Sequence, residues 1–170
     1  MSTIKKIEHA NTIKIVGKGI QDLRPLEHAK KIRVLLLAGN NISDLRPLSK
    51  LRIRWLDISR NPISNIRPLG EINTLETLWA SSLMVEDVSG LDELKKIRYL
   101  SLEDNKIVNV EPLSSLKKVE FLGLSKNKID DFRVLKKLNK VKFLSLKDNP
   151  IQYCPEKVSW TQLCIQERDN

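Results

Sequence analysis

The sequence predicts a right-handed α/β solenoid, with a parallel concave sheet on one side and short helical or 3-10 turns on the convex side. Three observations support this fold class. An apolar skeleton returns about every 22 residues, an asparagine marks the centre of most copies, and an Asp or Asn recurs behind that marker, usually followed three residues later by proline. Since one copy cannot bury its apolar side alone, the stack of copies is the stable unit.

The repeat is clearest in four segments that share one order of residues. They read IRVLLLAGNNISDLRPL from Ile32, IRWLDISRNPISNIRPL from Ile53, IRYLSLEDNKIVNVEPL from Ile97 and VEFLGLSKNKIDDFRVL from Val119. The marker asparagines are Asn40, Asn61, Asn105, Asn127 and Asn149. Their intervals are 21, 44, 22 and 22 residues, and the interval of 44 holds a further copy with Leu83 as its marker. With Lys18 as the marker of a first copy, seven copies span residues 10–152.

Each copy begins with alternating apolar residues, such as Leu35 and Leu37, which predict a short strand with one face inward. The inward marker amide that follows must satisfy its hydrogen bonds. Behind it comes a column of residues that suit the start of a helical turn, because their side chains accept hydrogen bonds from free N–H groups. This column is Asp22, Asp44, Asn65, Asp87, Asn109 and Asp131. Pro25, Pro47, Pro68 and Pro112 then fall inside the first turn, where a missing N–H does little harm.

This pattern, LxxLxLxxNxIxxLxxLxxL, resembles the 22-residue subclass of leucine-rich repeats. The subclass includes bacterial internalin-like proteins and the protein-phosphatase-1-regulatory type. The resemblance covers residues 10–152 and implies a leucine-rich-repeat solenoid. It also implies that the marker amides bond backbone groups of the turn and repeat as a ladder between coils.

Two copies depart from the pattern. In the first, Ala10 and Lys18 replace an apolar residue and the asparagine, which fits a terminal coil that is partly exposed. In the fourth, Leu83 replaces the asparagine and Gly90 the proline, so this coil must turn with different hydrogen bonds. We interpret the fourth copy as sequence drift that causes local irregularity, the alternative being a functional kink.

Both ends of the stack need caps. Residues 1–9 are expected to form the N-terminal cap and residues 153–170 the C-terminal cap. Cys154 and Cys164 either form a disulfide worth about 3 kcal/mol or stay reduced, and we favour the reduced form. The first twenty residues hold no apolar stretch of a secretory signal, so we expect a cytoplasmic protein. No segment is long enough to span a bilayer.

The sequence favours a protein without enzymatic activity. It contains no Gly-rich phosphate loop, no HExxH and no nucleophile elbow. His9 and His28 lie in the first coil and the two cysteines beyond the seventh, too far apart for a catalytic dyad. The Asp column is explained by the helical turns. We therefore expect no catalytic residue, no metal site and no cofactor.

The strand residues between the inward leucines predict a binding face. One outward column is Thr12, Val34, Trp55, Thr77, Tyr99, Phe121 and Phe143, and the adjacent one is Lys14, Leu36, Asp57, Trp79, Ser101, Gly123 and Ser145. Exposed aromatic patches mark interaction sites. We therefore expect this face to bind a protein, with the chain acting as a monomer or as a subunit of a hetero-complex. The expected binding residues are Val34, Leu36, Trp55, Asp57, Arg60, Trp79, Tyr99, Glu103, Phe121, Lys126 and Phe143, with Asp104 and Lys147 completing a mixed-charge rim.

The alternative function is binding of nucleic acid or of an anionic surface. The chain carries 30 Lys and Arg against 21 Asp and Glu, a net charge of +9. A predicted basic edge precedes the strands and consists of Lys30, Lys31, Lys50, Arg52, Lys95, Lys96, Lys117, Lys118 and Lys140. Arg24, Arg46, Arg67 and Arg133 form a second column on the helical side. Such columns could neutralise phosphates, but they lack interleaved aromatic residues for base stacking, which favours a solvated rim.

Overall fold

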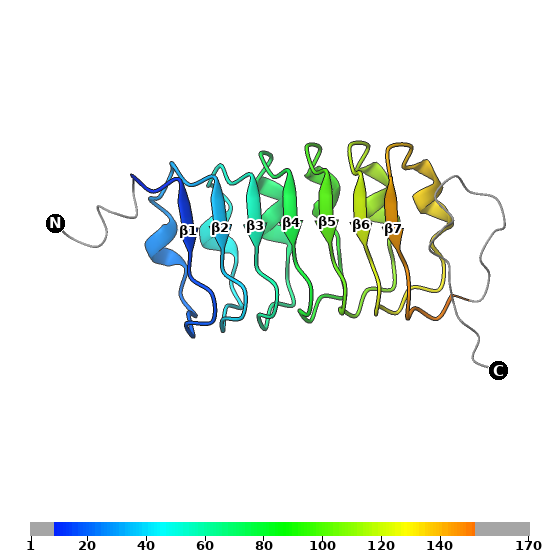
Figure 1. The fold of residues 1–170 in the computed structure, drawn as a ribbon, viewed down its shortest axis with the longest axis horizontal. Helices are drawn as coiled ribbons and strands as arrows, with labels where there is room; N and C mark the ends of the chain where they lie inside the picture. Colours follow the sequence, from blue (N-terminus) through cyan, green and yellow to red (C-terminus); the bar gives the residue numbers. More distant parts are fainter. Residues whose placement is uncertain (1–8, 152–170) are drawn as a thin grey trace.

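The computed structural model describes residues 9–151 and contains seven short strands in one parallel sheet, ordered as they occur in the chain (Figure 1). The strands are β1 (Thr12–Lys14), β2 (Val34–Leu36), β3 (Trp55–Asp57), β4 (Thr77–Trp79), β5 (Tyr99–Ser101), β6 (Phe121–Gly123) and β7 (Phe143–Ser145). Each consists of three residues, and its middle residue is buried. This confirms the repeated coils with alternating inward leucines.

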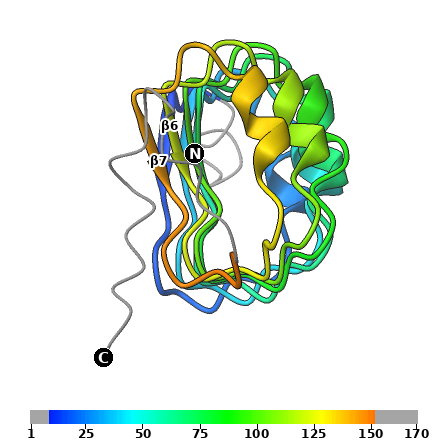
Figure 2. The same ribbon diagram turned by 90° about the vertical axis from the view of Figure 1, so that its right-hand side faces the viewer.

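The pairing register does not slip along the sheet. Leu35 pairs with Leu56, Leu56 with Leu78 and Leu78 with Leu100, and the outward residues on either side pair in the same way. Seen from the end, the sheet forms one wall and the helical turns form the opposite wall (Figure 2). The outer face of the sheet therefore carries each predicted outward column as a continuous row.

The helical turns are 3-10 helices. They are η1 (Arg24–Leu26), η2 (Arg46–Leu48), η3 (Arg67–Glu71), η4 (Leu91–Glu93), η5 (Glu111–Ser115) and η6 (Arg133–Lys137). The Asp and Asn column does accept backbone N–H groups: Asp22 Oδ1 accepts from Arg24 N–H at 2.9 Å, and Asn109 Oδ1 from Glu111 N–H at 2.8 Å.

The predicted starting point of these turns is nevertheless wrong in detail. In five of the six copies whose helical turn is described, all but the fourth, the helical turn begins two residues after the Asp or Asn, and the residue between them, such as Leu23, is the N-cap without a side-chain capping bond. The reason is that this N-cap position points its apolar side chain into the core, where Leu23 is 2% exposed. The carboxylate thus closes a tight turn just ahead of the helix.

The marker asparagines form the predicted ladder. Asn40, Asn61, Asn105, Asn127 and Asn149 are at most 9% exposed. The Asn127 Nδ2 group donates to Leu102 O of the preceding coil at 2.9 Å and to Leu124 O of its own coil at 3.0 Å. Its Oδ1 accepts from Ile107 N–H at 3.0 Å. Each amide therefore joins two coils, and every buried side-chain polar atom in residues 9–151 has a partner.

The fourth copy is irregular, as predicted, but only on its turn side. Leu83 is 7% exposed, and its side chain has no oxygen to accept a hydrogen bond from the preceding coil. Ile63 N–H of the third coil therefore donates to the carbonyl of Asn61, at 2.8 Å. Gly90 has φ +93°, and a side chain at Gly70 would meet the Gly90 carbonyl at 2.4 Å. The backbones of the third and fourth coils therefore approach directly at Gly90, a position that is proline in the first, second, third and fifth copies.

The predicted caps fall almost wholly outside the described residues. This applies to residues 1–8, to all of 153–170 and thus to Cys154 and Cys164. No helix in the part of the chain that the structure describes is long and apolar enough to cross a membrane.

Candidate functional site

Large apolar side chains stand exposed on the outer face of the sheet. Trp55, Trp79, Tyr99 and Phe143 are 46, 48, 43 and 38% exposed, although each belongs to a strand. We call the outer side of β2 to β7 the aromatic face; it carries Val34, Leu36, Trp55, Asp57, Trp79, Tyr99, Phe121 and Phe143. Its rows arise because residues of the same place in each copy pair in register.

The aromatic face contains a shallow apolar hollow of about 240 Å³, lined by Trp55, Thr77, Trp79, Tyr99, Leu100, Ser101 and Phe121. The register explains its shape. Thr77 pairs with Trp55 on one side and Tyr99 on the other, so a small residue lies between two large rings. Ser101 stands beside Trp79 in the second row. Four of the expected binding residues thus meet in one hollow, here called the aromatic hollow.

Sequence reasoning omitted Thr77 and Ser101 from the expected binding residues. Both belong to the outward columns, but the expected binding residues have large apolar or charged side chains, which Thr77 and Ser101 lack. The signal was the alternation itself: Trp, Thr and Tyr in successive copies of one column, and Trp followed by Ser in the other. In a parallel sheet with strands about 4.8 Å apart, a small residue between two rings leaves a gap.

Neighbouring contacts hold several of these rings in place. Phe121 and Phe143 stack with centroids 4.7 Å apart and an interplanar angle of 1°. The guanidinium of Arg98 lies over the Tyr99 ring, 5.7 Å from its centroid. Stacking and cation–π contacts of this kind restrict the orientation of the rings. Preorganised rings lose less conformational entropy on binding.

A second, polar depression of about 710 Å³ adjoins the aromatic hollow and shares Trp79 and Ser101 with it. We call it the polar groove. The predicted rim residues do meet there: its lining includes Asp57, Arg60, Glu103, Asp104, Lys126 and Lys147. Val34 and Leu36, which were also expected to bind, lie on β2 beyond Trp55 and line neither depression.

At the start of the strands, charges of opposite sign face one another across coils. Arg54 and Glu76 are 3.7 Å apart, and Arg98 and Lys142 approach Glu120 at 2.5 and 2.7 Å. The cations beside Glu120, Lys142 above all, lower the pKa of its carboxyl group, and Glu120 raises the pKa of Arg98. The sequence analysis did not detect this column of alternating charge. Because these side chains form ion pairs with one another, the column has few unpaired charges for an outside ligand.

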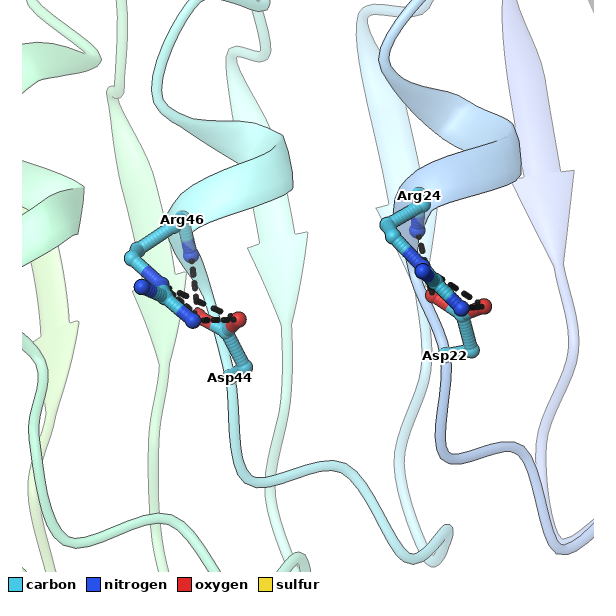
Figure 3. Close-up of polar contacts among 4 residues, drawn as sticks. All are labelled: Asp22, Arg24, Asp44 and Arg46. Atoms are coloured by element: carbon cyan, nitrogen blue, oxygen red, sulfur yellow. Dashed lines mark hydrogen bonds and ion pairs between the residues drawn. The ribbon is translucent and has the colours of Figure 1, made fainter.

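The two basic columns of the alternative function differ in their surroundings. The residues of the basic edge are all exposed. The arginine column is not free: Arg24 and Arg46 bind Asp22 and Asp44 of their own coils at 2.7 and 2.8 Å (Figure 3). Arg133 pairs with Asp131 at 2.5 Å, and Arg67 lies 3.6 Å from Asp87. The arginines that the sequence suggested for phosphate binding are therefore engaged in ion pairs within the protein.

Among residues 9–151, no group of three or more His, Cys, Asp or Glu side chains could hold a metal ion. The candidate site consists of the aromatic hollow and the polar groove, which lie side by side on the outer face of the sheet.

The repeats and the fold define a leucine-rich-repeat solenoid. Residues 95–137 match the family model described as leucine rich repeats in two copies. A comparison with curated protein sequences finds no match. A leucine-rich-repeat fold is typically a protein-binding module and is generally non-catalytic.

The structure is similar to three solved bacterial structures. Internalin C2 of Listeria monocytogenes superposes with a TM-score of 0.70 at 24% identity, over 96% of this chain and 83% of that one. Internalin InlF of the same species gives 0.69 at 22% identity, covering 90% and 52%. A leucine-rich-repeat protein of Leptospira interrogans gives 0.72 at 18% identity, covering 87% and 45%. The chain thus spans about half the length of two of these three proteins. At these identities the likeness is one of fold.

Proposed function

We propose that this protein is a non-enzymatic interaction module that binds a protein partner through the aromatic face. The observation that carries the proposal is the aromatic hollow, in which Trp55, Trp79 and Tyr99 stay more than 40% exposed around an apolar floor. Tryptophan and tyrosine side chains on a rigid sheet are the commonest binding hot spots. The mixed charges of the polar groove suit the mixed polar surface of a protein.

Affinity capture with matched variants tests this function. Wild type and the double variant Trp55→Ala/Trp79→Ala are immobilised and offered the same extract of the source cell. We expect at least one protein to bind wild type and to be lost with the double variant. Met84→Ala is the control, since Met84 is 44% exposed but lines neither depression. Identical captured sets on all three proteins would contradict the proposal.

A second function, binding of nucleic acid or an anionic surface, is supported by the exposed basic edge. Two of its lysines already bond protein: Lys95 Nζ donates to the carbonyl of Asp92, and Lys117 Nζ to that of Ser114 at 2.7 Å. The edge also lacks aromatic residues on which bases could stack. We therefore rank it below the aromatic face.

A further inference from the structure

The carboxylate of Glu103 lies on the aromatic face and not out in solvent. A side chain built at Gly123 would come within 3.1 Å of the Glu103 Cγ and Oε1 atoms, so Glu103 folds back over Gly123. Gly123 pairs with Ser101, which lines the aromatic hollow. The carboxylate is therefore about one strand spacing, ~4.8 Å, from the edge of the hollow. A side chain at position 123 would make a tight contact with Glu103 and displace its carboxylate.

A second carboxylate, that of Asp57, lies at the opposite end of the same row of outward residues, beside Trp79. Asp57 pairs directly with Trp79 across β3 and β4 and is half-buried. Its Oδ1 accepts from Ser59 N–H at 3.0 Å, which fixes the carboxylate in place. Asp57 and Glu103 thus stand on either side of the position where Trp79 and Ser101 join the hollow to the polar groove.

Neither carboxylate has a cationic partner within residues 9–151. The ion pairs in this part of the chain involve Asp22, Asp44, Glu76, Glu86, Asp87, Glu111, Glu120 and Asp131. The cations of the polar groove, Arg60, Lys126 and Lys147, are exposed and lie in the segments that follow the strands, more than 4 Å from these carboxylates. A partner that places a cation beside Glu103 would supply what folding leaves out.

We infer that the partner presents a basic anchor: a polypeptide segment in which an apolar side chain fills the aromatic hollow and a neighbouring Arg or Lys reaches Glu103. The inference rests on the proposed function and specifies its chemistry. The apolar stem of the basic residue packs along the row from Trp79 to Ser101, and its cation ends beside the Glu103 carboxylate. Arginine is favoured because its planar group bonds a carboxylate with two hydrogen bonds.

The net charge of +9 alone would favour an acidic partner. The local arrangement outweighs it, because charges beyond about 10 Å are screened at physiological salt whereas Glu103 and Asp57 border the contact itself. An acidic segment placed in the hollow would lie close to two carboxylates that form no ion pair within residues 9–151.

Selection from a phage-displayed library of random dodecapeptides tests the inference. The library is selected on wild type and, separately, on Trp79→Ala. We expect wild type to enrich peptides with an apolar residue within two positions of Arg or Lys, and Trp79→Ala to enrich none of them. The affinity of one such synthetic peptide is then measured with its arginine and with citrulline, which has nearly the same shape but no charge.

Citrulline in the peptide and Glu103→Gln in the protein should each weaken binding about tenfold, since a charged hydrogen bond is lost. Glu71→Gln, on the exposed end of η3, should leave affinity unchanged. Enriched peptides without a basic residue, with acidic residues instead, or insensitive to citrulline and Glu103→Gln would overturn the inference while the proposed function stands. Equal enrichment on wild type and Trp79→Ala would overturn both. Self-association of wild type that Trp79→Ala abolishes would point to a second copy and also overturn it.

Discussion

The side of this solenoid that carries the 3-10 helices and the side that carries the sheet differ in how their charged side chains are paired. On the turn side, Arg24 and Asp22 bond one another within a coil, and this arrangement recurs in the coils of Arg46 and Arg133. On the sheet side, Trp55 and Trp79 remain exposed, and Glu103 and Asp57 lack an ion pair within residues 9–151. These charges of the turn side are therefore paired within their coils, whereas these two carboxylates of the sheet side form no ion pair within residues 9–151.

The largest effect should come from removing a ring of the aromatic face. Trp79→Ala is expected to weaken binding of the captured partner by about 2 kcal/mol or more, because the ring supplies contact area that loses its water on binding. The free energy of unfolding should change little, since the ring is 48% exposed. Titration calorimetry and urea denaturation measure the two quantities. A lower free energy of unfolding with unchanged partner affinity would contradict this contrast between the two sides.

In the interior, between the sheet and the turns, a substitution should lower the free energy of unfolding and leave partner affinity nearly unchanged. Asn105→Ala removes three donated bonds, to Ala80, Leu102 and Glu103 carbonyls at 2.9–3.2 Å, and one accepted from Val85 N–H. Buried backbone groups then lose partners, at a cost of about 1–3 kcal/mol of unfolding free energy.

Lys106→Ala is the matched control for Asn105→Ala. Lys106 is exposed, and its ion pair with Glu86 is long at 3.9 Å. Loss of its side chain should therefore lower the free energy of unfolding very little. Both variants are compared by urea denaturation. Equal losses in the two would mean that the ladder does not hold the coils together, and partner affinity should be nearly unchanged in both.

Sequence periodicity was sufficient for the fold because each copy repeats the same physical problem. The spacing of Leu35 and Leu37 dictates a strand, and a buried amide such as Asn40 must be bonded, so seven copies stack in one register. Outward aromatic residues follow from the same alternation. The aromatic face could therefore be located by residue number before any coordinates.

Details that depend on contacts between copies could not be predicted in this way. Nothing in the spacing shows that Glu103 lies over Gly123, since this depends on a side-chain conformation across neighbouring coils. Pairing of Arg24 with Asp22 was missed because arginines were counted as free charge. At Leu83 the sequence predicted an irregularity, but only the structure shows that Ile63 N–H turns to the Asn61 carbonyl.

The basic edge offers a smaller test of the same contrast. If it bound nucleic acid through several phosphates, affinity for duplex DNA would fall steeply as salt rises, and Lys95→Ala/Lys96→Ala would flatten that slope. We expect weak binding at low salt and no measurable difference between the double variant and wild type above about 150 mM salt. Fluorescence anisotropy with labelled duplex DNA and single-stranded RNA measures both. Tight binding that survives Trp79→Ala but disappears at moderate salt would transfer the function to this edge.

The smallest effect concerns the ion pairs of the turn side. Asp131→Asn should preserve the backbone bond to Arg133 N–H, because Asn65 and Asn109 make the same bond in their own copies. It removes only the exposed ion pair with Arg133, so Tm at pH 7 should fall slightly or not at all.

The pH dependence of that small difference identifies its cause. Hydrogen bonds from the Arg133 side chain and backbone lower the pKa of Asp131 from its ordinary value to about 2. Because the folded state lowers this pKa, the carboxylate stabilises the fold above its ordinary pKa, and this contribution is lost as pH falls towards about 2. The difference in Tm between wild type and Asp131→Asn should therefore shrink between about pH 5 and pH 2. Asp131→Ala, which also loses the backbone bond, should stay less stable than both at every pH. A difference that grows on acidification would show that Asp131 does not stabilise the turn side as a carboxylate.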